Sequence, residues 1–440
     1  MVGSGVFLLP AALGAYGGVS LVGWLFTSAG AALLAITFAR LARRIPRAGG
    51  PYAYTRASFG EFPAFLVAWG YWLSICAGNA AIAVAMVGYL GFFWPALATG
   101  PALGALAALA AVWLLTAVNA RSVRGAGGVQ LVTTLLKLLP LLAVGTLGLA
   151  FAHWENFTPF NVSGRSSLGA VSATAALTLW AFLGLESATI PANEIERPER
   201  TIPRATLLGT AVAAVVYILG TVGVMGMLPP AALAHSTAPF ADAASLMWGP
   251  WAARAVAAGA AVSCFGALNG WILLQGQLPL AAAVDGLLPR VFARVSPRGT
   301  PVAGLVISSV LVTLVVATNY TRGLVNEFAF IILLSTLTAL VPYLFSTLAL
   351  VWQEAVSRRP SAVSRQPSAV SAAAGKWRAG AALVPALAFG YALWAVVGTG
   401  TETVFWGCVL LLAGVPVYAG LRRRGRGASS GGIGTTSPCA

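Results

Sequence analysis

Apolar stretches of about 20 residues recur from one end of the chain to the other, separated by short segments that hold most of the polar residues. Each stretch is long enough to cross a hydrocarbon core of about 30 Å as a helix. Spans are expected near 19–39, 63–93, 101–120, 127–151, 168–193, 205–228, 252–284, 301–318, 327–352, 379–398 and 403–421. The pattern predicts an all-α polytopic membrane protein with a single transmembrane domain, residues 1–421.

The opening segment, near 3–16, is a twelfth apolar stretch. Roughly 14 residues at about 1.5 Å each reach about 21 Å, so this segment is too short to span alone. It contains the triplet Gly3-Ser4-Gly5, where a membrane helix can break. In the sixth span, Gly184 precedes the carboxylate Glu186. Interrupted helices at matching positions of two halves are typical of inverted-repeat transporters and of their substrate sites.

Composition agrees with a membrane protein, and charge predicts its orientation. The chain is 58% hydrophobic and 8% charged, whereas a soluble chain carries about 25% charged residues. The net charge is +15, and only Arg165, Arg254 and Arg322 fall in loops between the basic segments. By the positive-inside rule, the basic segments and the C-terminus are cytoplasmic. Topology therefore explains the charge, and we expect a multi-pass inner-membrane protein that does not bind nucleic acid.

Two polar segments are predicted to be disordered. Loop 355–375 contains a short repeat with Pro360 and Pro367, which exclude a continuous helix. The basic tail, 422–440, is rich in Gly, Ser and Thr.

Patterns typical of catalysis or cofactor binding are absent from the sequence. The four cysteines have no metal-ligand or disulfide spacing, no Gly-rich phosphate loop occurs, and no nucleophile is paired with His153 or His235. We expect a protein that is not an enzyme and that takes no metal or cofactor.

Three polar side chains inside the spans are candidate functional groups, because burying an unpaired charge or polar group is costly. Glu186 is either satisfied by backbone donors freed at the interruption or acts as a proton-linked gate. Lys137 either snorkels to the cytoplasmic face or replaces a coupling cation beside the broken helices. Asn79 either joins two helices by a hydrogen bond or lines the cavity.

The interruptions and two mid-span tryptophans suit an amino-acid ligand. Backbone N–H groups at the start of the helix after Gly5 suit a carboxylate. Carbonyls freed at Trp180 and Leu183 suit an ammonium group. Trp180 and Trp271 lie away from the interfacial belts, and each either packs in the core or offers its face to a cation.

Several motifs spread over nearly the whole chain carry a family resemblance. They are Gly3–Pro10, Gly49–Tyr54, Tyr71-Trp72 through Gly78-Asn79, Trp180–Glu186, Gly270-Trp271, Gly299–Gly304 and Val341–Tyr343. In these motifs the chain resembles the amino acid–polyamine–organocation transporters, within the branch of basic amino acid/polyamine antiporters, and looks most like the bacterial arginine/agmatine antiporters.

The resemblance implies a twelve-helix, five-plus-five inverted repeat of the LeuT type, with the first and sixth helices interrupted. Residues 1–151 would form the first repeat, 168–353 the second repeat and 379–421 the last two helices. Such antiporters are often homodimers, so the resemblance also implies a homodimer.

The resemblance implies that the protein binds both the carboxylate and the ammonium group of an amino acid. Gly3, Ser4 and Gly5 would bind the substrate carboxylate. Trp180 would cover the substrate as the outer gate, and the carbonyls of Trp180 and Leu183 would take its ammonium group.

Further residues would contact the rest of the substrate. Asn79 and Ser335 would contact its distal end, and Trp271 would stack on a guanidinium. Phe328 would shape the pocket from the tenth span.

The resemblance also implies a gate and a coupling group. Tyr71, Glu186 and Tyr343 would form the inner gate, with Glu186 linked to the response to pH. Lys137 departs from an arginine/agmatine exchanger and resembles the lysine that replaces sodium in sodium-independent relatives, including proton-coupled symporters.

Family members have a cytoplasmic segment and half a helix before the Gly-Ser-Gly triplet, whereas only Met1 and Val2 precede it here. We expect a truncated chain or a true start upstream, which an in-frame apolar stretch there would support.

The sequence predicts a secondary active amino-acid transporter that works by alternating access and exchanges amino acids, with arginine or another cationic amino acid as the candidate substrate. Two alternatives stay open: a proton-coupled amino-acid symporter of broader specificity, and a non-transporting amino-acid sensor.

Overall fold

The computed structural model describes residues 4–121, 138–139, 141–190, 192, 195–319, 324–356 and 369–430. Within these ranges the chain is built from helices and contains no β-strand. The longer α-helices are α2 (Val19–Arg44), α4 (Glu61–Gly91), α6 (Pro101–Arg121), α8 (Ser167–Phe182), α9 (Pro198–Met227), α12 (Pro250–Val284), α13 (Val302–Asn319), α14 (Leu324–Val356), α15 (Ala369–Gly398), α16 (Thr401–Leu412) and α17 (Gly414–Ser430).

Shorter elements complete the fold. The short α-helices are α1 (Ser4–Gly14), α3 (Pro51–Phe59), α5 (Pro95–Thr99), α10 (Pro230–Leu233) and α11 (Pro239–Trp248). Single turns of π- or 3₁₀-helix are η1 (Ala143–Leu147), η2 (Gly148–Phe151), η3 (Trp154–Phe157), η4 (Ser187–Thr189) and η6 (Arg290–Ala293).

The helices confirm a polytopic membrane protein. Among the described residues, 7 helical stretches are long and apolar enough to cross a bilayer, and they include α2, α4, α6, α9, α12 and most of α14. Shorter apolar helices lie at Gly5–Gly14, Ser167–Phe182, Val302–Ala317 and Ala382–Gly398. The first part of the predicted span 127–151 lies outside the described residues.

Two expected disordered segments differ from the structure at their edges. Helix α14 continues to Val356 and α15 begins at Ala369, so helix extends into both ends of the predicted loop 355–375. Helix α17 continues to Ser430, so the predicted tail 422–440 begins as helix. Each of these helices contains an apolar span next to the predicted boundary, and a helix that has formed adds residues at either end at little cost. The rest of both segments lies outside the described residues.

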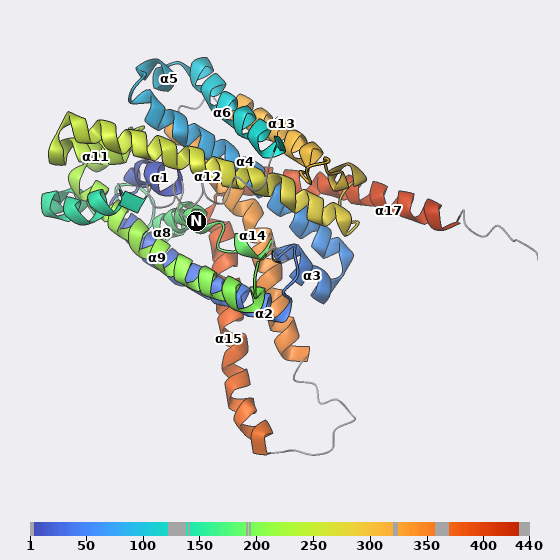
Figure 1. The fold of residues 1–440 in the computed structure, drawn as a ribbon. Coiled ribbons are helices and arrows are strands. Elements are labelled where there is room, and N and C mark those ends of the chain that lie inside the picture. Colours follow the sequence, from blue (N-terminus) through green and yellow to red (C-terminus); the bar gives the residue numbers. More distant parts are fainter. Residues whose placement is uncertain are drawn as a thin grey trace, which may run out of the picture.

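Helix α4 lies at the centre of the bundle. Buried residues make up 89% of its apolar window, a larger share than in any other candidate span described. It packs most extensively against α14 and α12. Figure 1 shows α2 and α9 side by side, α6 beside α13, and α14 beside α15. Most side chains on the central helix therefore face other helices, and their polar groups must be satisfied by those neighbours.

Small residues allow the helices around α8 to approach closely. A Cβ on Gly23 of α2 would collide with Thr174 of α8. On the same pair of helices, Thr27 Oγ1 donates to the Ala175 carbonyl (3.1 Å), and Thr178 Oγ1 donates to Thr27 Oγ1 (2.8 Å). Close backbone approach with hydroxyl bonds between helices is how membrane helices associate when burial from water cannot drive them together.

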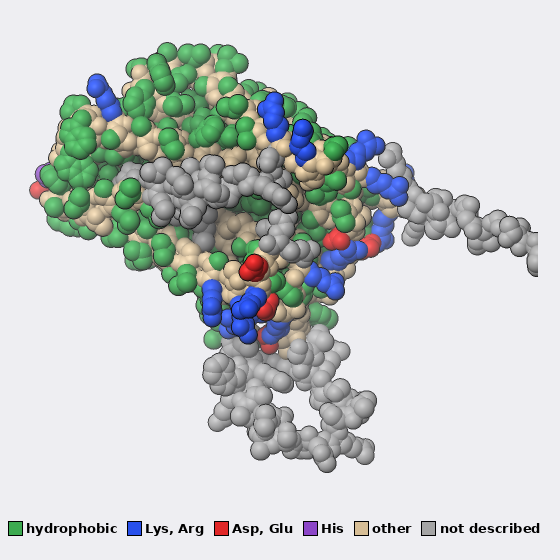
Figure 2. All heavy atoms as spheres, in the orientation of Figure 1, with side chains coloured by type: hydrophobic (Ala, Val, Ile, Leu, Met, Phe, Trp, Pro, Cys, Tyr) green, Lys and Arg blue, Asp and Glu red, His purple; other side chains and the backbone are tan. Residues whose placement is uncertain are grey.

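Ion pairs gather at one end of the bundle, which we call the basic end. Arg44 at the end of α2 pairs with Glu354 at the end of α14. Arg56 of α3 pairs with Asp285 after α12 (3.6 Å). Arg422 of α17 pairs with Glu61 at the start of α4 (3.2 Å). Figure 2 shows Lys and Arg side chains collected along the lower and right edges of the molecule, beside a broad apolar surface.

The close packing of α2 on α15 predicts a stability difference between two glycines. A Cβ on Gly30 would overlap the ring of Tyr391, so Gly30→Ala is expected to lower the free energy of unfolding by about 1–3 kcal/mol. Gly390→Ala, on α15 where a Cβ meets nothing within 4 Å, is the control. Thermal unfolding in detergent measures both. Equal unfolding temperatures for the two variants would contradict this account of the interface.

Candidate functional site

The sixth span is broken where the sequence predicts. Helix α8 ends at Phe182, and Leu183 leaves the helix with φ −58° and ψ 137°. Gly184 has φ +98°, a left-handed conformation that glycine adopts without strain. The chain then closes into η4, with Ser187 N–H bonded to the Gly184 carbonyl (3.1 Å). The turn carries Glu186 into the centre of the bundle.

The predicted gate residues meet at this break. Glu186 is fully buried, with 0% of its surface exposed. Tyr343 Oη of α14 donates to Glu186 Oε2 (2.5 Å), and Tyr71 Oη of α4 donates to Glu186 Oε1. We call these three residues the carboxylate clasp. It joins the broken segment to α4 and α14, so movement of that segment must release at least one of the two hydroxyls.

Trp180 closes the region on the other side of the break. It packs edge-on against Phe328 of α14, with ring centroids 5.4 Å apart and an interplanar angle of 89°. Gly5 of α1 also approaches it, because a Cβ there would lie 2.7 Å from the Trp180 ring. The expected free carbonyl of Trp180 differs in the structure: it accepts the N–H of Leu183 (3.1 Å). Trp180, Phe328 and α1 thus form one aromatic cover.

Two predicted substrate contacts are engaged with other helices. Asn79 is fully buried on α4 and donates from Nδ2 to Gln275 Oε1 of α12 (2.7 Å). Ser335 Oγ donates to the Ser74 carbonyl, and Ser74 Oγ donates to the Ser335 carbonyl, both at 2.8 Å. The Asn79–Gln275 bond joins two helices, which was one of the two interpretations of Asn79 from the sequence. Trp271 is half-buried on α12, one turn before Gln275.

Two cavities lie on either side of the break. The first, of about 510 Å³, is lined by Ala12 of α1, Leu177 of α8, and Asn326 and Leu333 from the first half of α14. Because Glu354 at the far end of α14 lies at the basic end, this first cavity faces the opposite end of the bundle. We call it the distal cavity.

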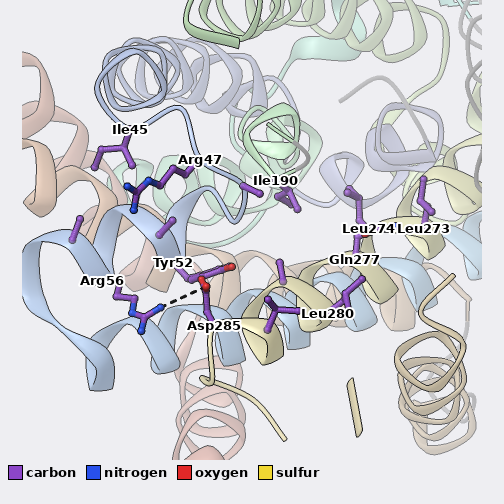
Figure 3. Close-up of a pocket in the computed structure, with 15 residues that line it drawn as sticks. Ile45, Arg47, Tyr52, Arg56, Ile190, Leu273, Leu274, Gln277, Leu280 and Asp285 are labelled. Carbon is purple, nitrogen blue, oxygen red and sulfur yellow. Dashed lines mark ion pairs between the residues drawn. The ribbon is translucent and has the colours of Figure 1, made fainter. Parts of the chain in front are cut away.

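The second cavity, of about 840 Å³, opens at the basic end. Its polar lining includes Arg47, Tyr52, Arg56 and Asp285 (Figure 3). Figure 3 shows Tyr52 and Asp285 next to one another and the Arg56–Asp285 ion pair at the rim. Burial, followed by the nearby Asp285 carboxylate, raises the pKa of Tyr52, so its hydroxyl remains a hydrogen-bond donor. This basic-end cavity can hold a polar solute.

The broken segment separates the two cavities. Leu177, one turn before Trp180, lines the distal cavity, whereas Ile190, just after Glu186, lines the basic-end cavity. Trp180, Phe328 and the three clasp residues line neither cavity. A broken segment with a cavity on each side is the arrangement that exposure of a solute to one side at a time requires.

Some sequence predictions cannot be placed and some site residues were missed. Gly3 and Lys137 lie outside the described residues. Gln275 was not among the predicted residues, although a polar residue within the apolar run after Trp271 was a usable signal. Asp285 was not predicted either, because it has no special sequence context and becomes notable only beside Tyr52 and Arg56. Among the described residues no cluster of His, Cys, Asp or Glu could hold a metal ion.

Comparison with known proteins gives consistent matches over most of the chain. A family model described as amino acid permease matches residues 1–415. The cadaverine/lysine antiporter of Escherichia coli (strain K12) is 36% identical over 371 residues, which cover 82% of each chain. The putrescine transporter PotE of the same strain is 30% identical over 424 residues, 95% of this chain and 92% of the relative. PotE of Haemophilus influenzae is 30% identical over 356 residues, 80% of each chain.

The carboxylate clasp predicts a difference between two buried tyrosines. Tyr343→Phe leaves Glu186 Oε2 without its donor, and a buried unpaired acceptor costs about 1–3 kcal/mol or more. We expect a lower unfolding temperature in detergent. The control is Tyr217→Phe on α9, because the buried Tyr217 hydroxyl has no hydrogen-bond partner among the described residues. If Tyr217→Phe destabilised the protein as much, the clasp would not be the source of the loss.

Proposed function

Because the chain belongs to the amino acid permease family, we propose that it exchanges a basic amino acid for an amine across the inner membrane by alternating access. The family and the relatives are transporters, so the chain is a transporter and not an enzyme. In the proposal the C-terminus is cytoplasmic, and the helices form the twelve-helix, five-plus-five arrangement with both repeats broken at the substrate site. A homodimer belongs to the same proposal.

One observation carries this proposal: two cavities open toward opposite ends of the bundle and are separated by a broken helix. A transporter of this kind binds its solute at the break and opens one side at a time. The aromatic cover formed by Trp180 and Phe328 would be the gate on the distal side. The carboxylate clasp would be the gate on the basic side.

The substrate class rests on the relatives and on the chemistry of the site. The relatives' names specify cadaverine, lysine and putrescine, which all carry ammonium groups. Trp180, Phe328 and Trp271 can supply aromatic faces, which attract cations. Ser4 and Gly5 at the start of α1 would bind the carboxylate of an amino acid, and the carbonyl of Leu183 would take its ammonium group.

Proton-coupled uptake is the second candidate function, and the carboxylate clasp is the observation that favours it. Glu186 is fully buried, and the described groups that bond to its carboxylate oxygens are neutral hydroxyls. A carboxylate in such a place can bind and release a proton during the cycle. Lys137 would take part in coupling under this reading.

Flux into proteoliposomes distinguishes the functions. We expect labelled lysine to enter only when the vesicles hold lysine, cadaverine, putrescine or agmatine, because an exchanger returns across the membrane only when loaded. Uptake into empty vesicles driven by an inward proton gradient would show that the protein is a proton symporter and not an exchanger. Binding of lysine without flux under either condition would identify a sensor. Arginine and a neutral amino acid complete the substrate series.

The clasp also predicts a pH response that belongs to Glu186. A protonated carboxyl offers one acceptor fewer to the two tyrosines, so exchange by the native protein is expected to rise as the pH falls. Glu186→Gln keeps the shape but cannot titrate, and its exchange rate should be flat between about pH 5 and pH 8.

Asp242 of α11 provides the control for this pH response. Burial raises the pKa of its carboxyl, which accepts a hydrogen bond from Ser236 Oγ (2.5 Å), so it is a second acid-sensitive group. We expect Asp242→Asn to keep the native pH profile. A profile that flattens in Asp242→Asn but not in Glu186→Gln would refute the assignment to the clasp.

A further inference from the structure

The amide of Asn79 is only half satisfied. Its Nδ2 donates to Gln275 Oε1 (2.7 Å), but its Oδ1 is buried and has no hydrogen-bond partner among the described residues. Both Asn79 and Gln275 are 0% exposed. A buried carbonyl oxygen normally has a donor, so an unpaired one beside a proposed solute site is available to accept from the solute.

The orientation of the Gln275 amide follows from a chain of hydrogen bonds that starts at a backbone carbonyl. Thr116 Oγ1 of α6 donates its one hydrogen to the Val112 carbonyl (2.7 Å). Thr116 and Ser309 hydroxyls are 2.7 Å apart, so Ser309 of α13 must donate to Thr116. Ser309 Oγ is then left to accept, and the group of Gln275 that lies 2.8 Å from it must be the Nε2 amino group.

A second, longer contact to a backbone carbonyl supports the same orientation. Gln275 Nε2 lies 3.4 Å from the carbonyl oxygen of Leu305, and a carbonyl can only accept. The oxygen of Gln275 therefore faces Asn79. Asn79 must present its amino group to that oxygen, which leaves Asn79 Oδ1 as the free atom. Gln275, through its contacts with α13, thus determines that the unpaired atom of the Asn79 amide is its oxygen.

We propose that Gln275 is a positioning residue for substrate selectivity, because it holds the Asn79 amide with its oxygen toward the terminal ammonium group of a diamine or basic amino acid. This inference rests on the proposed function, in which Asn79 contacts the distal end of the substrate. An oxygen at this place accepts from an ammonium group and is left unpaired by an apolar tail. A site built for a hydrogen bond rejects an analogue that lacks the bonding group. Trp271, one turn away on α12, adds an aromatic face on the same helix.

A second buried amide pair provides a matched control. Asn119 Nδ2 of α6 donates to Asn269 Oδ1 of α12 (2.8 Å), so this pair also ties α12 to a neighbouring helix. It differs from the Asn79–Gln275 pair in having no proposed contact with the solute. If buried amides act only by joining helices, both pairs should affect the protein in the same way.

The test measures equilibrium binding of lysine and of norleucine, which lacks the terminal ammonium group, to the purified protein in detergent. The readout is the ratio of the two Kd values. In Gln275→Met the Asn79 amide loses its fixed orientation, and the preference for lysine is expected to fall about tenfold. In Asn119→Leu the ratio should stay within about twofold of the native value. A ratio that is unchanged in Gln275→Met, or that falls equally in Asn119→Leu, overturns the inference.

A second variant keeps the test decisive if Gln275→Met does not fold. Ser309→Ala removes one acceptor of Gln275 Nε2 but leaves the Leu305 carbonyl, so a smaller fall of about threefold is expected, and an unchanged ratio overturns the inference. Exchange in proteoliposomes is measured in parallel. A native protein that prefers lysine in binding but does not exchange refutes the proposed function and leaves this inference standing. A native protein that binds both ligands equally overturns the inference alone.

Discussion

The structure must supply hydrogen-bond donors to the buried carboxylate of Glu186. An acidic group in the centre of a membrane protein needs donors, and here both come from side chains on other helices, Tyr71 of α4 and Tyr343 of α14. The break at Gly184 brings the carboxylate between those helices. The segment after the break is therefore tied to the most buried helix of the bundle.

The packing around this contact divides the molecule into tight and adjustable parts. Helices α2, α8 and α15 meet through glycines and small hydroxyl residues, such as Gly23 and Gly30, that leave no room for a side chain. Interfaces of this kind move as units, because their close packing tolerates little deformation. Each cavity has a short or irregular element on one side, α1 for the distal cavity and α3 with the segment before it for the basic-end cavity. On the other side each is bordered by a long helix, α14 or α12, so opening would move a short element against a long one.

Polar groups elsewhere in the bundle, like Glu186, form hydrogen bonds with side chains on other helices. Asn79, Gln275, Ser309 and Thr116 form a chain through α4, α12, α13 and α6 that ends on a backbone carbonyl. In a membrane interior each donor in this chain needs an acceptor. The bond from Thr116 to a backbone carbonyl, which can only accept, therefore fixes the donor and the acceptor in every other bond of the chain. The chain leaves a single oxygen of Asn79 free, and this couples outer helices to the polarity of the proposed substrate site.

The recurrence of apolar stretches was sufficient to predict the helices that the structure describes in most spans, because a span must match the thickness of the bilayer. The position of Gly184 was sufficient to predict the break in the sixth span, because it depends on local backbone geometry. The motifs also identified the family. Their residues named Tyr71, Glu186 and Tyr343 as a group, but only the fold shows that the two hydroxyls reach the carboxylate. The roles of Gln275 and Asp285 were not readable from the sequence, since each depends on partners more than 25 residues away in the chain. Local pattern thus determined which segments form helices and where the sixth span breaks. Tertiary packing alone decided which polar atoms are paired, because hydrogen bonds in a membrane interior are made between helices that are distant in sequence.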